Sequence, residues 1–376
     1  MKGEKRKKIA FFTPTLHGGG AERMMVDIAN EFSLEDYEVD LLFVTSKDAD
    51  LFPLIRPEVN LINFSSGKMQ YVIPKLTSYL KNSEVDAIIS TQFHANVALA
   101  FSSTLANYRG KVIYRLCNMM TTYWRGNSRR RNFKGWLFIR LFMSFTLKRA
   151  NVIIAQTQAM KDEVVNDYSA SISKIKIIPN FIDQQKINEL AKEEVDHKWL
   201  NDREKGVPII LSAGRLDLQK DWNTLLLAFQ NLQKKIKVKL IIIGDGPDKK
   251  KLKGYIKDNK LENSVSLAGF QLNPFSWFAK ADLFVLSTFG EGFPNVVIQA
   301  LACNCPLVST DVPSAPSEIL EDCKWGRLSK VKDHDSLSRC MFESLESKNI
   351  INLKERADSY SKDKIIVKWF ELIEDN

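Results

Sequence analysis

The sequence contains no unbroken apolar run that approaches the roughly 20 residues of a membrane-spanning helix. Its basic start, Met1 to Lys8, is not followed by the apolar core of a secretory signal. Cysteines are few, and their spacings match neither a zinc site nor a disulfide framework: Cys117, Cys303, Cys305, Cys323 and Cys340. We therefore expect reduced, structural thiols in a protein that is cytosolic or held at a membrane surface.

Acidic residues are absent from residues 87–161. The formal net charge is +9, and it is unevenly placed. Residues 1–183 hold 25 Lys and Arg against 17 Asp and Glu, whereas residues 184–376 hold 29 against 28. The basic character therefore belongs to the first half of the chain.

The length of 376 residues and the hydrophobic content of 44% favour two domains of roughly 180 residues each. Short apolar strands alternate with helical segments in two series, which is typical of parallel sheets covered on both faces. The first series comprises Ile9–Thr13, Val39–Val44, Ala87–Ser90, Val112–Arg115, Val152–Ala155 and Ile175–Ile178. The second comprises Pro208–Ser212, Lys239–Ile243, Val265–Ala268, Leu283–Leu286 and Leu307–Ser309.

We accordingly predict an α/β protein with a Rossmann-like domain over residues 1–185, a linker over 186–206 and a second Rossmann-like domain over 207–360. Residues 361–376 have apolar side chains at helical spacing, and we expect this helix to pack back on the first domain. Ligands of open α/β sheets bind at the carboxyl ends of the strands, so each domain offers one binding edge.

A glycine-rich loop, Leu16-His17-Gly18-Gly19-Gly20-Ala21-Glu22, follows the first predicted strand and opens a helix. Glycines let backbone N–H groups approach an anion, and a helix N-terminus attracts negative charge. The spacing is not Gly-x-Gly-x-x-Gly, which disfavours a dinucleotide site. A plain turn between strand and helix is the other interpretation.

The second domain has two candidate phosphate loops. Arg215 and Lys220 follow the strand that ends near Ser212, and two cations there suit a diphosphate. The other loop, Ser287 to Gln299, contains Glu291, and Pro294 fits the first turn of a helix that runs to about Ala302. The alternatives are a solvated basic loop and a solvated acid before a core helix.

Taken in order along the chain, these motifs resemble family 4 of the retaining glycosyltransferases. They are Gly19-Gly20-Ala21-Glu22, Ile178-Pro179-Asn180-Phe181-Ile182-Asp183, Gly214-Arg215-x4-Lys220, Ile243-Gly244-Asp245-Gly246-Pro247, Val265-x3-Gly269-Phe270 and Glu291-Gly292-Phe293-Pro294-Asn295. The resemblance covers nearly the whole chain. It implies the GT-B fold, in which two doubly wound domains face a central cleft.

The resemblance also assigns roles to residues. Gly19 and Gly20 would contact the donor diphosphate from the first domain, while Arg215 and Lys220 would hold it from the second.

Gly269-Phe270 would border the nucleobase, Glu291 would meet the donor sugar, and the backbone turn of Phe293, Pro294 and Asn295 would cap the phosphate, with N–H groups from Phe293 and Asn295. Gln299 stands where the family's second Glu contacts the ribose. A glutamine keeps an acceptor oxygen but loses the charge, which puts the ribose contact in doubt. Another departure is Asp221, because many relatives have Gly after the lysine.

His94 follows the strand that ends at Ser90, on the same predicted edge as the glycine loop. Related enzymes place a histidine in this region near the donor sugar or acceptor, whereas a lone histidine is often structural. Asn118, after the next strand, is a further candidate for acceptor contact.

A basic and aromatic segment follows. Arginines beside aromatic rings suit an anionic lipid layer. A core helix over Trp136–Leu147 behind a solvated loop, a nucleic-acid site and an acceptor pyrophosphate site are the alternatives. The candidate residues are Trp124, Arg125, Arg129, Arg130, Arg131, Lys134 and Trp136.

The resemblance implies transfer of a hexose or N-acetylhexosamine, from a UDP-sugar rather than a GDP-sugar, to a glycan or polyprenyl-diphosphate-linked acceptor. The stretch Ser309 to Leu320 is most similar to bacterial enzymes that build surface polysaccharides or lipid-linked oligosaccharides. We expect retention of configuration, no cofactor, no metal, no nucleic-acid partner, and a cytoplasmic enzyme peripheral on the inner face of the membrane. An NAD-dependent oxidoreductase and a basic nucleic-acid-binding protein are the alternatives from other classes.

Overall fold

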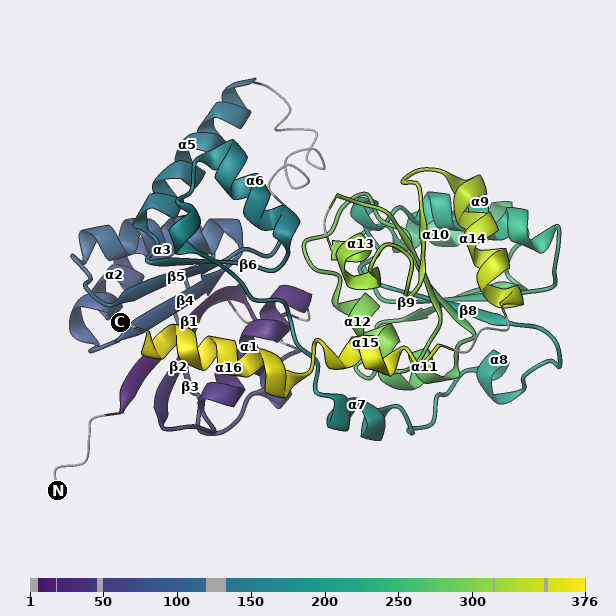
Figure 1. The fold of residues 1–376 in the computed structure, drawn as a ribbon, viewed down its shortest axis with the longest axis horizontal. Helices are drawn as coiled ribbons and strands as arrows, with labels where there is room; N and C mark the ends of the chain where they lie inside the picture. The colour runs from purple at the N-terminus through teal and green to yellow at the C-terminus, as the bar shows by residue number, and fades with distance from the viewer. Residues whose placement is uncertain are drawn as a thin grey trace. The chain divides into compact units, whose positions relative to one another are not determined.

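The computed structural model describes residues 6–17, 19–45, 50–119, 133–313, 315–347 and 351–375. The chain divides into two compact units (Figure 1). Unit 1 comprises residues 1–180 and 365–376, and unit 2 comprises residues 181–364. Among the described residues, no helix combines the length and the apolar character that crossing a membrane requires.

Unit 1 is built on a seven-stranded sheet in the order β3-β2-β1-β4-β5-β6-β7, and every pair is parallel. The strands are β1 (Lys7–Thr15), β2 (Tyr37–Thr45), β3 (Asn60–Asn63), β4 (Ala87–Thr91), β5 (Lys111–Arg115), β6 (Val152–Ala155) and β7 (Ile175–Ile177). The helices are α1 (Gly20–Phe32), α2 (Val72–Asn82), α3 (Phe93–Leu105), α5 (Phe133–Arg149), α6 (Gln158–Tyr168) and α16 (Lys362–Glu374), with short 3₁₀ turns at Phe52–Leu54, Met69–Tyr71 and Ile172–Lys174.

The alternation of side chains along each strand separates the two faces of the unit 1 sheet. Ala10 and Phe12 of β1 pack into a core with α2, α3, α5 and α6. Phe11 points to the other face, where its ring meets Phe32 of α1, and Phe32 in turn contacts Phe370 of α16 at 4.9 Å between centroids. Helices therefore cover both faces, which is why the strands read as near-continuous apolar runs.

Unit 2 repeats this plan with a six-stranded parallel sheet in the order β10-β9-β8-β11-β12-β13. The strands are β8 (Ile209–Ala213), β9 (Lys239–Ile243), β10 (Val265–Gly269), β11 (Leu283–Leu286), β12 (Leu307–Thr310) and β13 (Arg327–Ser329). The helices are α7 (Gln184–Leu190), α8 (Lys198–Asn201), α9 (Trp222–Gln233), α10 (Lys249–Asp258), α11 (Phe275–Lys280), α12 (Asn295–Ala302), α13 (Ala315–Leu320), α14 (His334–Glu346) and α15 (Lys354–Asp358), with a 3₁₀ turn at Leu218–Lys220.

The unit 2 sheet also has a core on each face. Ile209 and Leu211 of β8 pack with α11, α12 and α15, whereas Ile210 packs with α9, α10 and α14. The two predicted parallel α/β sheets are thus confirmed. Two strands were missed by the sequence prediction, β3 and β13, because both are short edge strands without a long apolar run.

Strand order reverses at one point in each sheet. In unit 1 the chain leaves β1 toward β2 on one side and returns to β4 on the other, and in unit 2 the same happens at β8 and β11. The loops that follow β1, β4, β8 and β11 diverge above the sheets, and such switch points are where doubly wound sheets bind ligands. The glycine loop and His94 follow β1 and β4, and the loops of Arg215 and Glu291 follow β8 and β11. Asn118 follows the neighbouring strand β5, and Gly269-Phe270 lies at the end of β10.

Candidate active site

The loops after β8 and β11 of unit 2 are joined by a set of short hydrogen bonds. Phe289 N donates to Gln219 O at 2.9 Å, and Thr288 Oγ1 donates to the same carbonyl at 3.0 Å. In the other direction, Gln219 Nε2 donates to Gly290 O at 2.6 Å. The two predicted phosphate loops therefore form one rigid platform at the switch point.

On this platform, Lys220 and Glu291 form an ion pair. Lys220 Nζ lies 2.5 Å from Glu291 Oε1, and the two side chains are only 15% and 9% exposed. Ser287 Oγ donates to Lys220 O at 2.9 Å, which ties the backbone at the lysine to the second loop. A cation and a carboxylate that sequence reasoning assigned to diphosphate and sugar thus lie next to each other.

Arg215 stands at the rim of the same platform. Its side chain is 73% exposed, and its Nε lies 3.7 Å from Asp217 Oδ2. Asp217 caps the 3₁₀ turn by accepting a hydrogen bond from Gln219 N. Burial raises the pKa of Asp217 although Arg215 and Lys220 both act to lower it. The arginine is therefore a largely solvated cation that can reach an anion above the strand ends.

Two glycines that carried no role in the sequence prediction brace the Arg215 loop. A Cβ on Gly244 would lie 1.9 Å from Gly214 O, and one on Gly246 would lie 2.5 Å from Leu216 O. Leu216 N donates to Asp245 O at 2.9 Å across the same contact. The loop after β9 must therefore keep glycines at both positions for the Arg215 loop to lie against it.

Asp221, which stands where the family resemblance leads us to expect a glycine, has a backbone conformation that suits glycine. Asp221 adopts a left-handed conformation with φ of +46°, which glycine enters without strain. Here its side chain caps α9 instead, accepting a hydrogen bond from Thr224 N at 3.3 Å. The departure from the family pattern is thus a helix cap, consistent with no direct part in chemistry.

The start of α12 differs by one residue from the sequence prediction. Pro294 is the N-cap residue rather than part of the first turn, and no side chain caps the helix. Val297 N donates to Pro294 O at 2.9 Å, and the positive end of the helix dipole lies at this first turn, where helices attract anions. Phe293 before it is buried, while Asn295 and Gln299 lie one turn apart and half-buried on the same face of α12.

Gly269 and Phe270 lie at the end of β10, on the outer side of the β9 loop. Gly269 has φ of +78°, and its carbonyl accepts a hydrogen bond from Gly244 N at 2.7 Å. Phe270 is 53% exposed. The ring is therefore free to lie against a flat apolar ligand surface near the strand ends.

In unit 1, a hydrogen bond joins the glycine loop to the loop after β4. Gln92 Nε2 donates to Glu22 Oε1 at 2.7 Å. A Cβ on Gly19 would lie 2.2 Å from Glu22 Oε2, so this carboxylate lies directly beneath the loop. Gln92 has φ of +73° and ψ of 144°, a conformation that costs a non-glycine residue about 1–3 kcal/mol and is concentrated at functional sites. Sequence reasoning had no signal for Gln92.

The remaining unit 1 candidates are exposed at the same edge. Gly19 is the N-cap residue of α1, and Gly20 is its first residue. His94 lies in the first turn of α3, with its ring 5.4 Å from that of Phe93. Asn118 follows β5 and is exposed.

Sequence reasoning also missed Arg115, a buried cation at the end of β5. The residue is 1% exposed, and its guanidinium donates to Thr91 Oγ1 at 3.0 Å and to Asn180 Oδ1 at 2.5 Å. Burial lowers its pKa to about 10, so it stays charged at neutral pH. It thereby fixes Asn180, the last residue of unit 1 before the chain enters unit 2.

Two family profiles match consecutive parts of the chain. The family described as Glycosyltransferase Family 4 matches residues 18–186, and the one described as Glycosyl transferases group 1 matches residues 194–364. The chain is a family 4 glycosyltransferase with the GT-B fold.

Relatives and solved structures agree with this assignment. The chain is 28% identical over 372 residues to the N-acetylgalactosamine-N,N'-diacetylbacillosaminyl-diphospho-undecaprenol 4-alpha-N-acetylgalactosaminyltransferase of Campylobacter jejuni, with 96% of this chain and 97% of that protein covered. It is 23% identical over 378 residues to the GalNAc-alpha-(1->4)-GalNAc-alpha-(1->3)-diNAcBac-PP-undecaprenol alpha-1,4-N-acetyl-D-galactosaminyltransferase of the same organism, covering 97% and 98%. Its fold is similar to that of Anabaena HepE in complex with UDP and glucose, with a TM-score of 0.80, 19% identity, and 99% and 100% of the chains covered.

Several predicted residues of this glycosyltransferase fall outside the described part. These residues are Trp124, Arg125, Arg129, Arg130 and Arg131. Lys134 and Trp136 belong to α5, but the side chains of residues 133–138 are not described. The basic and aromatic segment therefore stays a prediction.

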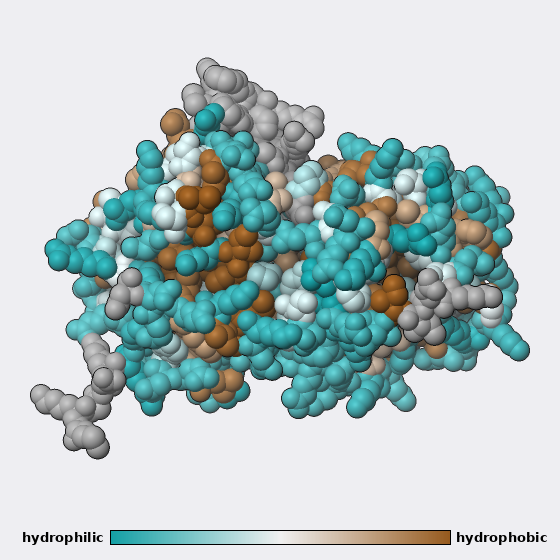
Figure 2. Space-filling view, in the orientation of Figure 1, coloured by the Kyte–Doolittle hydropathy of each residue, from teal (hydrophilic) through white to brown (hydrophobic). Residues whose placement is uncertain are grey.

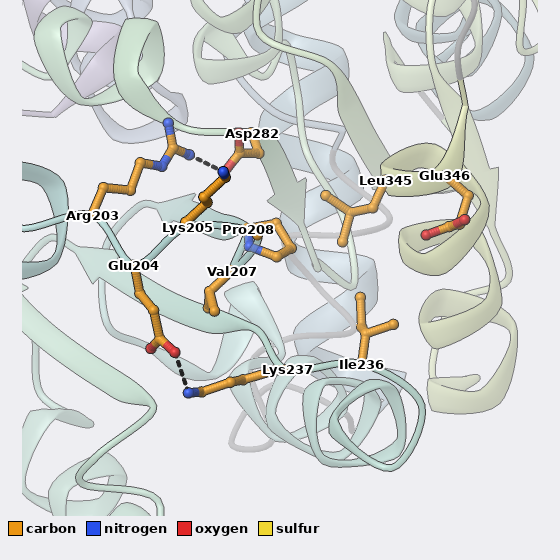
Figure 3. A pocket seen from close by; sticks show the side chains of 11 residues that line it. Arg203, Glu204, Lys205, Val207, Pro208, Ile236, Lys237, Asp282, Leu345 and Glu346 are labelled. Carbon is orange, nitrogen blue, oxygen red and sulfur yellow. Dashed lines mark hydrogen bonds and ion pairs between the residues drawn. The ribbon is translucent and has the colours of Figure 1, made fainter.

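A surface hollow of about 810 Å³ lies at the opposite edge of the unit 2 sheet, where the strands begin (Figure 3). Two ion pairs line it, Arg203 with Asp282 and Lys237 with Glu204. None of the candidate donor residues of the glycosyltransferase borders it. Among the described residues, no group of three or more His, Cys, Asp or Glu side chains could hold a metal ion, and metal independence stays a prediction.

Proposed function

We propose that this glycosyltransferase moves a hexose or N-acetylhexosamine from a UDP-sugar to a lipid-linked glycan, with retention of the anomeric configuration. The observation that carries the proposal is the Lys220–Glu291 pair on the switch-point platform of unit 2, 2.5 Å apart, with Arg215 at the rim. A nucleotide sugar carries a diphosphate next to a ring of hydroxyl groups. The platform offers cations and a carboxylate side by side.

The donor would exchange the ion pair for its own groups. Lys220 and Arg215 would bind the diphosphate oxygens, since charge-assisted hydrogen bonds to phosphate are about twice as strong as neutral ones. Glu291, released from Lys220, would accept hydrogen bonds from sugar hydroxyls. The backbone turn at Phe293, Pro294 and Asn295 would meet the phosphate at the start of α12.

The nucleotide would lie toward the β9 and β10 loops. Gly269 leaves a side-chain-free surface beside Phe270, and Gln299, one turn into α12, would accept a hydrogen bond from a ribose hydroxyl. UDP is supported by the HepE complex, which contains UDP and glucose.

A lipid-linked acceptor is supported by the names of both Campylobacter relatives, which act on undecaprenyl-diphosphate-linked sugars. In unit 1, Gly19 and Gly20 would approach the diphosphate, while His94 and Asn118 would contact the reacting sugars. Surface polysaccharide or glycoconjugate synthesis is the corresponding process.

In the proposed reaction, the bond between the anomeric carbon and the leaving phosphate oxygen breaks while the acceptor oxygen bonds to the same carbon. The acceptor proton passes to the leaving phosphate oxygen on the same face, which gives retention without a protein base. Lys220 and Arg215 would stabilise the charge that develops on the departing UDP, and this is the step where preorganised cations contribute most. The protein supplies orientation for the rest.

We also propose that unit 1 docks on an anionic membrane, on the cytoplasmic side. The stretch 87–161 has no acidic residue. On α5, Leu141 is 61% exposed beside Arg140, and Lys148 lies two turns further on the same face. Each cation near an anionic surface contributes about 1 kcal/mol.

A transfer assay tests the enzyme activity. Purified protein is given UDP-, GDP- and ADP-sugars with a polyprenyl-diphosphate-linked saccharide, and products are identified by mass spectrometry and anomeric NMR. We expect one UDP-sugar to be consumed and an α-linked product to form. Failure of every nucleotide sugar would contradict the proposal, and a β-linked product would contradict retention.

Vesicle sedimentation tests the membrane contact. Replacing Arg129, Arg130 and Arg131 with Ser should release the protein from phosphatidylglycerol vesicles, and raised salt should do the same to the wild type. Replacing Lys250, Lys251 and Lys253 on α10 of unit 2 provides a control with the same loss of charge. Equal sedimentation of the two triple variants with the vesicles would contradict the proposed membrane contact.

A further inference from the structure

The segment from Leu353 to Lys362 lies along α12 and contacts both of its ends. Beyond the C-terminal end, Leu353 N donates to Asn304 Oδ1 at 2.9 Å. Before the N-terminal end, the ring of Tyr360 lies edge-on to that of Phe293, with 5.7 Å between centroids and 65° between planes. Between them, Ala357 is fully buried in the same core as Val297 and Leu301. This segment therefore packs along the whole length of α12.

Tyr360 is itself held in place from several sides. It is 7% exposed, and its hydroxyl accepts a hydrogen bond from Arg356 Nη2 at 2.9 Å. Arg356 also donates to the carbonyls of Glu318 and Ile319 at the end of α13, and pairs with Glu321 at 3.0 Å. The ring against Phe293 thus cannot shift without disturbing the end of α13.

The backbone of Tyr360 marks the place where the chain enters and leaves unit 2. Ile182 N donates to Tyr360 O at 2.9 Å, and Lys362 N donates to Ile182 O at 2.8 Å. An ion pair of 3.2 Å between Lys362 and Asp183 lies beside this bridge. One tyrosine therefore contacts the donor loop through its ring and the entry segment through its carbonyl.

We propose that Tyr360 is a positioning residue for the donor: by holding Phe293 it fixes the loop that carries Glu291 and the first turn of α12. Phe293 is 8% exposed and only two residues from Glu291, so the Tyr360 ring is one of the walls against which the loop takes its shape. Without the ring, Phe293 gains room, and Glu291 and the α12 amides lose their fixed spacing to Lys220. The expected effect of Tyr360 on donor binding rests on the proposed function. The expected effect of Tyr360 on the shape of the loop rests on the fold alone.

Three variants separate positioning from general stability. Tyr360→Leu removes the ring, and Tyr360→Phe keeps the ring but loses the bond to Arg356. Phe229→Leu is the control, because Phe229 is fully buried in the core on the opposite face of the same sheet. The melting temperatures of the two leucine variants show whether their losses of stability are comparable.

The first measurement is hydrogen exchange of residues 287–296 in the ligand-free proteins. We expect Tyr360→Leu to speed exchange there by about threefold or more, with Phe229→Leu and Tyr360→Phe close to wild type. Equal exchange in both leucine variants would overturn the proposal. This result does not depend on what the enzyme binds.

The second measurement is the affinity for UDP by calorimetry. Loss of an edge-on aromatic pair corresponds to about a three- to tenfold weaker Kd for Tyr360→Leu, with Tyr360→Phe within about twofold of wild type. If wild type binds no UDP, the proposed function fails while the exchange result still decides the role of Tyr360. If wild type binds UDP and Tyr360→Leu binds it equally well, the positioning role fails alone.

Discussion

Lys220 and Glu291, 71 residues apart in the sequence, meet with 2.5 Å between Nζ and Oε1. They do so because β8 and β11 are neighbours in the sheet while the chain visits β9 and β10 between them. Both side chains are largely withdrawn from solvent. The residue proposed to bind phosphate and the residue proposed to bind the sugar are therefore neighbours, and each neutralises the charge of the other in the ligand-free protein.

The ion pair predicts a specific pattern in stability. Lys220→Gln leaves a buried carboxylate without its partner, and we expect a loss of about 3 kcal/mol in the free energy of unfolding. Glu291→Gln should cost a similar amount, whereas the double variant should recover most of the loss because no buried charge remains. Urea denaturation of the four proteins measures this. Additive losses would show that the two side chains do not interact.

Gly244 is predicted to be irreplaceable for a steric reason. An alanine there would bring Cβ within 1.9 Å of Gly214 O at φ of +134°, so Gly244→Ala must distort the Arg215 loop and should cost about 2 kcal/mol or more. Gly254 in α10 has nothing within 4 Å of a Cβ, so Gly254→Ala should raise stability by about 0.5–1 kcal/mol. Thermal unfolding of both variants is the measurement, and a stable Gly244→Ala would contradict the contact.

The sequence was most informative where burial decides the pattern. Strands such as Lys239–Ile243 are covered on both faces, so their apolar runs predicted the parallel sheets. The edge strand Asn60–Asn63 is mostly exposed and left no such run. The start of α12 was predicted one residue too early, because a proline is tolerated both as the N-cap residue and in the first turn of a helix.

Other features of the site have no local sequence signal. The left-handed Gln92 is imposed by its surroundings, and its residue type is not one that turns prefer. Arg115 reads as an ordinary strand-end cation, and only the tertiary structure shows it buried against Thr91 and Asn180. Features that depend on burial or on turn residues could be predicted from the sequence. Features that depend on contacts between loops distant in the sequence could not.

His197 is predicted to make stability fall in mild acid. Its Nδ1 accepts a hydrogen bond from Trp199 N, and burial lowers its pKa below the usual 6.5 although Asp196 acts to raise it. The stabilising contribution is therefore complete above pH 6.5 and is lost as pH falls through the lowered folded-state pKa, because protonated Nδ1 can no longer accept.

His197→Asn keeps an N-cap acceptor but does not titrate. Between pH 7.5 and 5 in the same buffers, the free energy of unfolding of His197→Asn should fall by less than that of the wild type. Parallel curves for the two proteins would refute the role of this histidine.

The cysteines are predicted to differ in reactivity. Burial raises the pKa of Cys117 to about 11 and that of Cys303 to about 12, and it raises the pKa of Cys305 further. Cys323 is exposed. Brief alkylation at pH 8 should therefore modify Cys323 first, since the thiolate is the reactive form. Peptide mapping by mass spectrometry reads the order, and early labelling of Cys305 would contradict the structure.

The donor platform is tested most directly by the affinity of Arg215→Gln for UDP. Arg215 is 73% exposed, so its removal changes the charge at the platform while leaving the fold intact. Calorimetry should give a Kd about 10- to 100-fold weaker than wild type, as expected for a lost charge-assisted bond to phosphate. Lys253→Gln on α10, which removes one exposed cation elsewhere in unit 2, should stay within about twofold. Equal affinity of Arg215→Gln and wild type, or no binding of UDP by either, would contradict the account.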